Sequence, residues 1–167
     1  MWEIVVGLPI IAVAGFIQVG FFGQIRLLGG TSDLILLCLV AWAINEKSKY
    51  SWILVIAGGL LMSYVSAMPM RGYIWMYLLI WVILRFIKMR VWQMPMILML
   101  FVTIIGTLII SIGTLVMLFL QNASVNYLDA FQQIIVPSLA MNLLLAIPVY
   151  AFLNDVINTI YGDEETE

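Results

Sequence analysis

The chain has 167 residues, of which 65% are hydrophobic and only 10% are charged, and its formal net charge is -2. Soluble domains use about a quarter of their residues as charged groups, so seven basic and nine acidic side chains are too few to cover a water-soluble globule of this size. In a bilayer, lipid solvates an apolar exterior. The composition therefore excludes an ordinary soluble protein and predicts an integral membrane protein, without a basic patch for nucleic acid.

The residue types that carry most enzyme chemistry are scarce. The chain has no histidine, which removes the commonest general base and metal ligand. The single cysteine, Cys38, excludes an intrachain disulfide and fits an apolar run as a small packing residue. No glycine-rich phosphate loop or cysteine cluster occurs, and the serines lack an activating base. We therefore expect a protein that is not an enzyme and holds neither a cofactor nor a metal.

Six apolar segments are candidates for membrane-spanning helices, which need roughly 20 residues to cross the hydrocarbon layer. They cover about 4–22, 32–45, 50–67, 73–87, 95–120 and 131–155. The joints between them are brief and rich in turn residues, so no linker separates domains. We expect an all-α protein with one six-helix membrane domain over residues 1–167, ending in a short acidic tail at 161–167.

The second of these segments is too short to cross the bilayer alone. Fourteen helical residues rise only about 21 Å. Short helices are tolerated where protein covers their ends, so we expect this helix to pack among the others. Asp33 precedes its apolar run and is expected to cap the first turn, where the amides are unsatisfied and the dipole is positive. The alternative is a contact with a partner or ligand, because acids within membranes are often functional.

The distribution of lysine and arginine predicts the orientation. With six spans, both termini share one side with the second and fourth loops. That side carries Lys47, Lys49, Arg85, Lys88 and Arg90, and the other side carries Arg26 and Arg71. The excess predicts cytoplasmic termini. Trp42, Tyr50 and Trp52 bracket the loop at Lys47, as interfacial aromatic residues do.

Small and polar residues recur at helical spacing in two spans. Thr103, Thr107 and Ser111 lie four apart in the fifth span, and Gly59 and Ser63 lie four apart in the third. Such ridges let helices approach closely. The spacing leaves open whether they pack within the chain or against another chain.

The sixth span also contains a polar spot. Asn142 lies four residues after Ser138, so both side chains share one face of a helix. We expect Asn142 to make a hydrogen bond within the core.

The stretch LLGGTSDLILLCLVAWAINEKSKYSWILVIAGGLLMSYVSAMPMRG resembles MreD, the family of bacterial rod-shape-determining membrane proteins. The matching features are an aspartate before a leucine-rich helix, a charged loop, a glycine-containing helix and a Ser-x-x-Pro turn. They correspond here to Asp33, Gly58, Gly59, Ser66 and Pro69. The C-terminal NLLLAIPVYAFL, with Asn142 and Pro148, is also similar to the family. Ser32 replaces a frequent proline, and Ser63 replaces an aspartate found in many members.

The resemblance implies a non-enzymatic scaffold of the cell-elongation machinery in the bacterial cytoplasmic membrane. Its expected partner is MreC, a bitopic membrane protein, within an assembly that includes MreB, RodA and a penicillin-binding transpeptidase. A homodimer within that complex is left open. The fold of the family is similar to the six-helix substrate-binding subunits of energy-coupling-factor transporters. The expected partner-binding residues are Asp33, Gly58, Gly59, Ser63, Ser66, Pro69, Thr103, Thr107 and Ser111.

A second hypothesis follows from the transporter similarity. The chain would be the vitamin-binding membrane subunit of such a transporter, with a polar pocket near the extracytoplasmic side. The candidate pocket residues are Asp33, Arg71, Asn122, Asn126, Asp129 and Gln132. They indicate no ligand class, and the first helix lacks a clear alanine-xxx-alanine docking pattern, so we place this hypothesis behind the scaffold. An intramembrane enzyme is a distant third.

Overall fold

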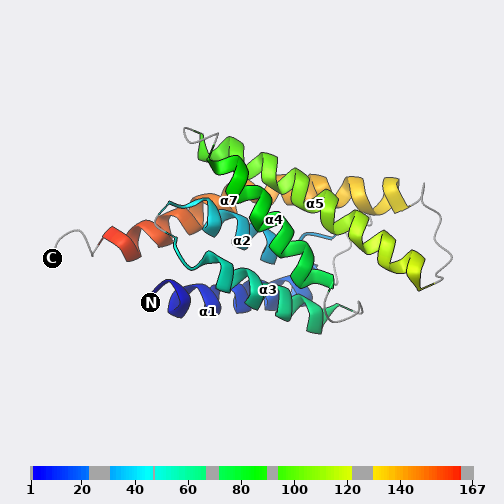
Figure 1. Cartoon of the computed structure of the whole chain (residues 1–167), viewed down its shortest axis with the longest axis horizontal. Helices are drawn as coiled ribbons and strands as arrows, with labels where there is room; N and C mark the ends of the chain where they lie inside the picture. Colours follow the sequence, from blue (N-terminus) through cyan, green and yellow to red (C-terminus); the bar gives the residue numbers. More distant parts are fainter. Residues whose placement is uncertain are drawn as a thin grey trace.

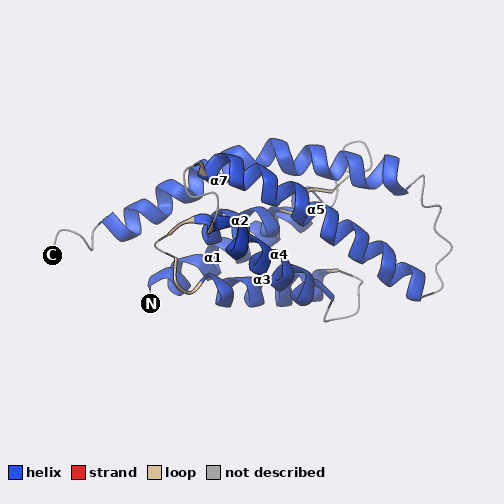
Figure 2. Ribbon diagram, turned by 45° about the horizontal axis from the view of Figure 1, so that its top comes forward, coloured by secondary structure: helices blue, strands red, loops and turns tan. Residues whose placement is uncertain are grey.

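The computed structural model describes residues 2–22, 31–46, 48–66, 72–89, 94–121 and 130–162. Within these ranges the chain is mostly helical and contains no strand (Figures 1 and 2). The expectation of an all-α protein is therefore confirmed. Pro69 and the residues after Gly162 lie outside the described ranges.

The helices follow the six predicted segments closely. They are α1 (Trp2–Ile17), continued by the π-helical turn η1 (Gln18–Phe22), then α2 (Leu34–Ile44), α3 (Ser51–Val65), α4 (Gly72–Lys88), α5 (Pro95–Leu120), and the π-helical turn η3 (Phe131–Ile135), which leads into α7 (Val136–Gly162). The last helix continues seven residues past the predicted end at 155, so the acidic tail begins later than expected. Three stretches are long and apolar enough to cross a membrane: Glu3–Gly20, Pro95–Leu120 and Phe131–Tyr161.

Successive helices run in alternating directions, which brings the start of α1 and the end of α7 to the same end of the bundle (Figure 1). There the Tyr161 hydroxyl donates to the Glu3 carboxylate at 3.2 Å. At the other end, the backbone N–H of Thr31 donates to Ser138 Oγ near the start of α7, at 2.9 Å. We call these the terminal end and the distal end.

The short helix α2 lies in the middle of the bundle (Figures 1 and 2). All eleven of its residues are buried, and it contacts each of the other five helices. Eleven helical residues rise only about 16 Å, roughly half of a hydrocarbon layer. The prediction that this helix packs among the others is confirmed.

The glycines of α3 allow two close helix contacts. A Cβ atom at Gly59 would lie 2.8 Å from Ile74 Cα, in the backbone of α4. A Cβ atom at Gly58 would lie 3.0 Å from side-chain atoms of Ile35 and Leu39 in α2. The small residues of α3 therefore pack against helices of the same chain.

We expect Gly59→Ala to destabilise the purified protein by about 1–3 kcal/mol, because the added methyl group meets a backbone atom that moves only with its helix. The measurement is thermal unfolding in mild detergent. Gly20→Ala is the matched control, because nothing lies within 4 Å of a Cβ at that position. Equal unfolding temperatures for the two variants would contradict the close α3–α4 contact.

Candidate functional site

Asp33 begins the polar cluster at the distal end of α2. Its Oδ1 accepts a hydrogen bond from the Leu36 backbone N–H at 2.9 Å, and its carbonyl accepts from the Leu37 N–H at 3.1 Å. The predicted N-cap is confirmed. Tyr77 of α4, itself buried, adds its hydroxyl at 3.0 Å from Oδ1 and 2.9 Å from Oδ2. The carboxylate thus connects the start of α2 to the middle of α4.

Asn142 of α7 joins three helices beside this cap. Its Oδ1 accepts from the Asp33 N–H at 2.8 Å and from Ser32 Oγ at 3.1 Å. Its Nδ2 donates to Thr107 Oγ1 of α5 at 2.9 Å. All four residues are buried, so the core hydrogen bond expected for Asn142 is confirmed. Gln18 of η1 completes the start of α2, because its Oε1 accepts from the Ile35 N–H at 3.1 Å.

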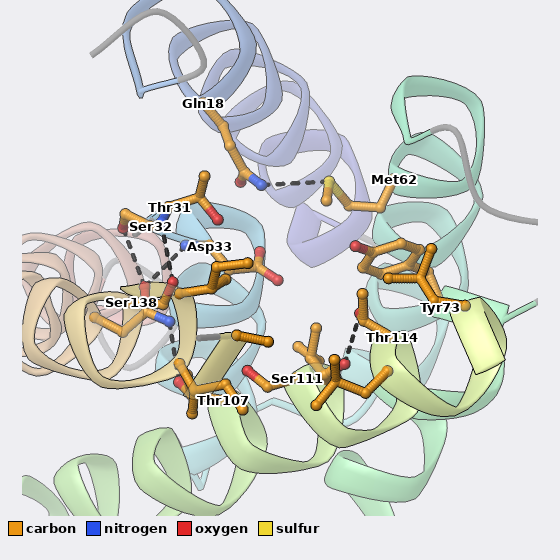
Figure 3. A pocket seen from close by; sticks show the side chains of 17 residues that line it. Gln18, Thr31, Ser32, Asp33, Met62, Tyr73, Thr107, Ser111, Thr114 and Ser138 are labelled. Carbon is orange, nitrogen blue, oxygen red and sulfur yellow. Dashed lines mark hydrogen bonds between the residues drawn. The ribbon is translucent and has the colours of Figure 1, made fainter. Parts of the chain in front are cut away.

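A cavity of about 190 Å³ opens next to this cluster (Figure 3). Polar and apolar side chains line it: Gln18, Thr31, Ser32, Asp33, Met62, Tyr73, Thr107, Ile110, Ser111, Thr114, Leu115, Leu118, Ala130, Ile134, Ile135, Ser138 and Asn142. Figure 3 shows Asp33, Ser111 and Tyr73 arranged around it. No lysine, arginine or cysteine occurs among these described lining residues. The described lining offers hydroxyl, amide and carboxyl groups beside apolar side chains.

Five of the predicted partner-binding residues are buried inside the described bundle: Gly58, Gly59, Ser63, Thr103 and Thr107. Ser63 Oγ donates to the Gly59 carbonyl of its own helix at 2.7 Å. The Thr103 hydroxyl has no hydrogen-bond partner among the described residues. The described contacts of these residues lie within the chain, and Thr107 also lines the cavity.

Of the remaining predicted residues, Asp33 is also buried and lines the cavity together with Ser111. Ser111 is half-buried and lines the cavity. Ser66 is half-buried and caps α3, its N–H donating to the Met62 carbonyl at 2.9 Å. Gln132, a candidate of the transporter hypothesis, is exposed in η3 and is not a lining residue. Arg71, Asn122, Asn126 and Asp129, like Pro69, lie outside the described residues.

A second buried carboxylate, Glu3, organises the terminal end, and sequence reasoning missed it. Its side chain is 2% exposed. Its donors are Trp42 Nε1 at 3.2 Å, Ser48 Oγ, the backbone N–H groups of Lys49 at 3.2 Å and Tyr50 at 3.0 Å, and the Tyr161 hydroxyl at 3.2 Å. The signal was an acid immediately before the first apolar segment. Trp42 is buried at 1% exposure, and its indole N–H donates to this carboxylate.

Lys88 caps the C-terminus of α2, at the terminal end of the bundle. Its Nζ donates to the carbonyls of Ala43 at 3.2 Å and Asn45 at 3.0 Å. A cation at a helix C-terminus satisfies carbonyls that have no partner within the helix. Partial burial lowers the pKa of the Lys88 ammonium group, and the charge of Glu46 acts in the opposite direction.

We expect Asn142→Ala to lower the free energy of unfolding by about 2–4 kcal/mol, because it leaves buried groups of α2 and α5 without a partner. Unfolding in detergent measures the loss. Asn158→Ala changes the same residue type at an exposed position of α7 and should cost less than about 0.5 kcal/mol. A small effect at both positions would show that Asn142 does not hold the three helices together.

We expect Glu3→Gln to destabilise the protein by about 2–4 kcal/mol, because an amide nitrogen replaces one of the two acceptor oxygens and faces donors. Glu46→Gln, at an exposed acid on the same end, should stay within about 0.5 kcal/mol of the parent. Both variants are compared by thermal unfolding. If Glu3→Gln is as stable as Glu46→Gln, the terminal cluster does not support the fold.

Comparisons with known proteins leave this geometry without a matching relative. No family model, no curated protein and no solved structure matches the chain.

Proposed function

We propose that the chain is a non-enzymatic membrane scaffold of the bacterial cell-elongation machinery, of the MreD kind. In this proposal it crosses the cytoplasmic membrane six times, with both termini in the cytoplasm. It binds an MreC-like bitopic protein and supports peptidoglycan synthesis by the associated RodA and penicillin-binding transpeptidase, together with MreB.

One hydrogen bond is the main support for this proposal. The two segments that resemble the MreD family lie far apart in the sequence, yet the Asp33 N–H of the first donates a hydrogen bond to Asn142 Oδ1 of the second at 2.8 Å, across 109 positions. Gly58 and Gly59, from the same resemblance, pack on α2 and α4. The residues of the resemblance thus belong to one structural unit, which supports a shared architecture rather than a chance likeness of apolar sequences.

The orientation proposed above agrees with the described charges. Arg85 and Lys88 lie with Glu46 around a surface depression, next to the α2 carbonyls that Lys88 binds at the terminal end. The Lys49 N–H contacts Glu3 at the same end. The positive-inside tendency then favours a cytoplasmic terminal end, and the cavity and Asp33 face the extracytoplasmic half.

Partner binding in this proposal uses the outer faces of the long helices, because the small-residue ridges are occupied inside the chain. Large apolar side chains are exposed on four helices: Phe16 on α1, Trp75 on α4, Phe119 on α5 and Leu144 on α7. A membrane partner with a single spanning helix needs an apolar face of this kind, with van der Waals packing as the main attraction. Asp33 and Asn142 contribute by fixing the helices that present these faces.

The cavity favours the second candidate function, a ligand-binding subunit of an energy-coupling-factor transporter. Its position beside Asp33 matches the pocket that this hypothesis requires. A transporter subunit would be isolated together with a pair of ATPases and a coupling membrane protein. The scaffold would instead be isolated with a single-span protein that has a large extracytoplasmic domain.

We expect affinity purification from native membranes in mild detergent, followed by mass spectrometry, to identify the MreC-like protein and wall synthases. Cysteine cross-linking can then locate the contact, because the native Cys38 is buried and gives little background. Single cysteines at positions 16, 75, 119 and 144 sample four helices. At least one should form a specific cross-link to the partner, whereas a buried control at Thr107 should form none. Recovery of ATPases in place of wall proteins would contradict the scaffold proposal.

A further inference from the structure

We propose that the cavity beside Asp33 is a binding site for a primary ammonium group on an aliphatic stem. The site does not depend on the scaffold role, because it is formed by the chain alone. Its source can be a free amine from the aqueous phase or the amino headgroup of a phospholipid, which present the same chemistry.

The charge of Asp33 is the first reason for a cation. Its carboxylate is 9% exposed and lines the cavity. All of its described donors are neutral: the Leu36 N–H, the Tyr77 hydroxyl and the Gln18 side chain. Buried charges are normally paired with opposite charge, and no cation occurs among the described lining residues.

The apolar residues of the lining are the reason for an aliphatic stem. Ile110, Leu115 and Leu118 of α5 face the space together with Ile134 and Ile135 of η3. The volume of about 190 Å³ exceeds the roughly 150 Å³ of an apolar cavity that accepts benzene. A ligand of about six to eight heavy atoms therefore fits, with its ammonium group at Asp33 and its stem against α5 and η3.

The conformation of the backbone around the cavity is a further reason to regard it as a binding site. The described helices contain two π-helical turns, η1 and η3, and both contribute lining residues, Gln18 from the first and Ile134 and Ile135 from the second. Because π-helical turns are rare and frequently occur at functional sites, their convergence on one space is consistent with a binding site. An anionic ligand would meet repulsion from Asp33, and a neutral one would leave its charge unpaired.

The test measures thermal unfolding of the purified chain in a neutral detergent with three probes of equal length: n-hexylamine, n-hexanol and hexanoate. We expect a saturable rise of about 2–4 °C with hexylamine alone. Asp33→Asn, which keeps an N-cap oxygen, should abolish the rise. Asp155→Asn, a matched change at an exposed acid of α7, should retain it. An equal rise with hexanol, or an unchanged response in Asp33→Asn, would overturn the proposal.

A second variant decides the question if Asp33→Asn does not unfold cooperatively. Ser111→Phe fills the cavity from α5 without touching the carboxylate, so it should abolish the response to the amine, and a retained response would overturn the proposal. A parallel titration with dilauroyl phosphatidylethanolamine and dilauroyl phosphatidylglycerol separates the two sources. An Asp33-dependent rise confined to the ethanolamine lipid assigns a lipid headgroup, whereas a rise with hexylamine assigns a free amine. If neither amine raises the unfolding temperature, the site is not an ammonium site, and the co-purification result is unaffected.

Discussion

The backbone amides and carbonyls at the two ends of α2 need hydrogen-bond partners, and the rest of the structure depends on this constraint. A helix of eleven buried residues leaves amides at one end and carbonyls at the other without partners inside the helix. Side chains outside the helix supply these partners. Asp33, Asn142 and Gln18 do so at the distal end, and Lys88 does so at the terminal end.

This constraint explains where the few polar residues of the chain occur. The groups that complete α2 come from α1, α4 and α7, so each hydrogen bond also fixes the position of a neighbouring helix. Thr107 extends the same network to α5. Apolar packing between helices is weakly directional in lipid, where no hydrophobic force drives association. The polar contacts therefore determine which faces of the long helices turn inward and which remain outside.

Hydrophobic patterning was enough to predict the helices, because long apolar runs between short turns have no other solution in a membrane. It also predicted the Asp33 cap and the core role of Asn142, since a lone polar residue in an apolar span needs a nearby partner. It could not predict which partner. The Glu3 cluster brings together positions 3, 42, 48 and 161. Their proximity depends on how each helix is rotated about its own axis. The direction of the Gly59 and Thr107 ridges and the shape of the cavity depend on the same rotation.

In the proposed scaffold, the polar residues of the two clusters would act on a partner by fixing the positions of the helices, without touching the partner. Asn142 holds α7 to α2 and to α5, so loss of its side chain would change the relative rotation of two helices whose outer faces carry Phe119 and Leu144. A membrane partner packed on those faces would lose complementarity without losing any residue that it touches. Occupancy of the cavity would act on the same pair of helices, because α5 and α7 supply most of its walls together with η3. The core of this bundle is thus the element that connects a ligand beside Asp33 to the surface that a partner would recognise.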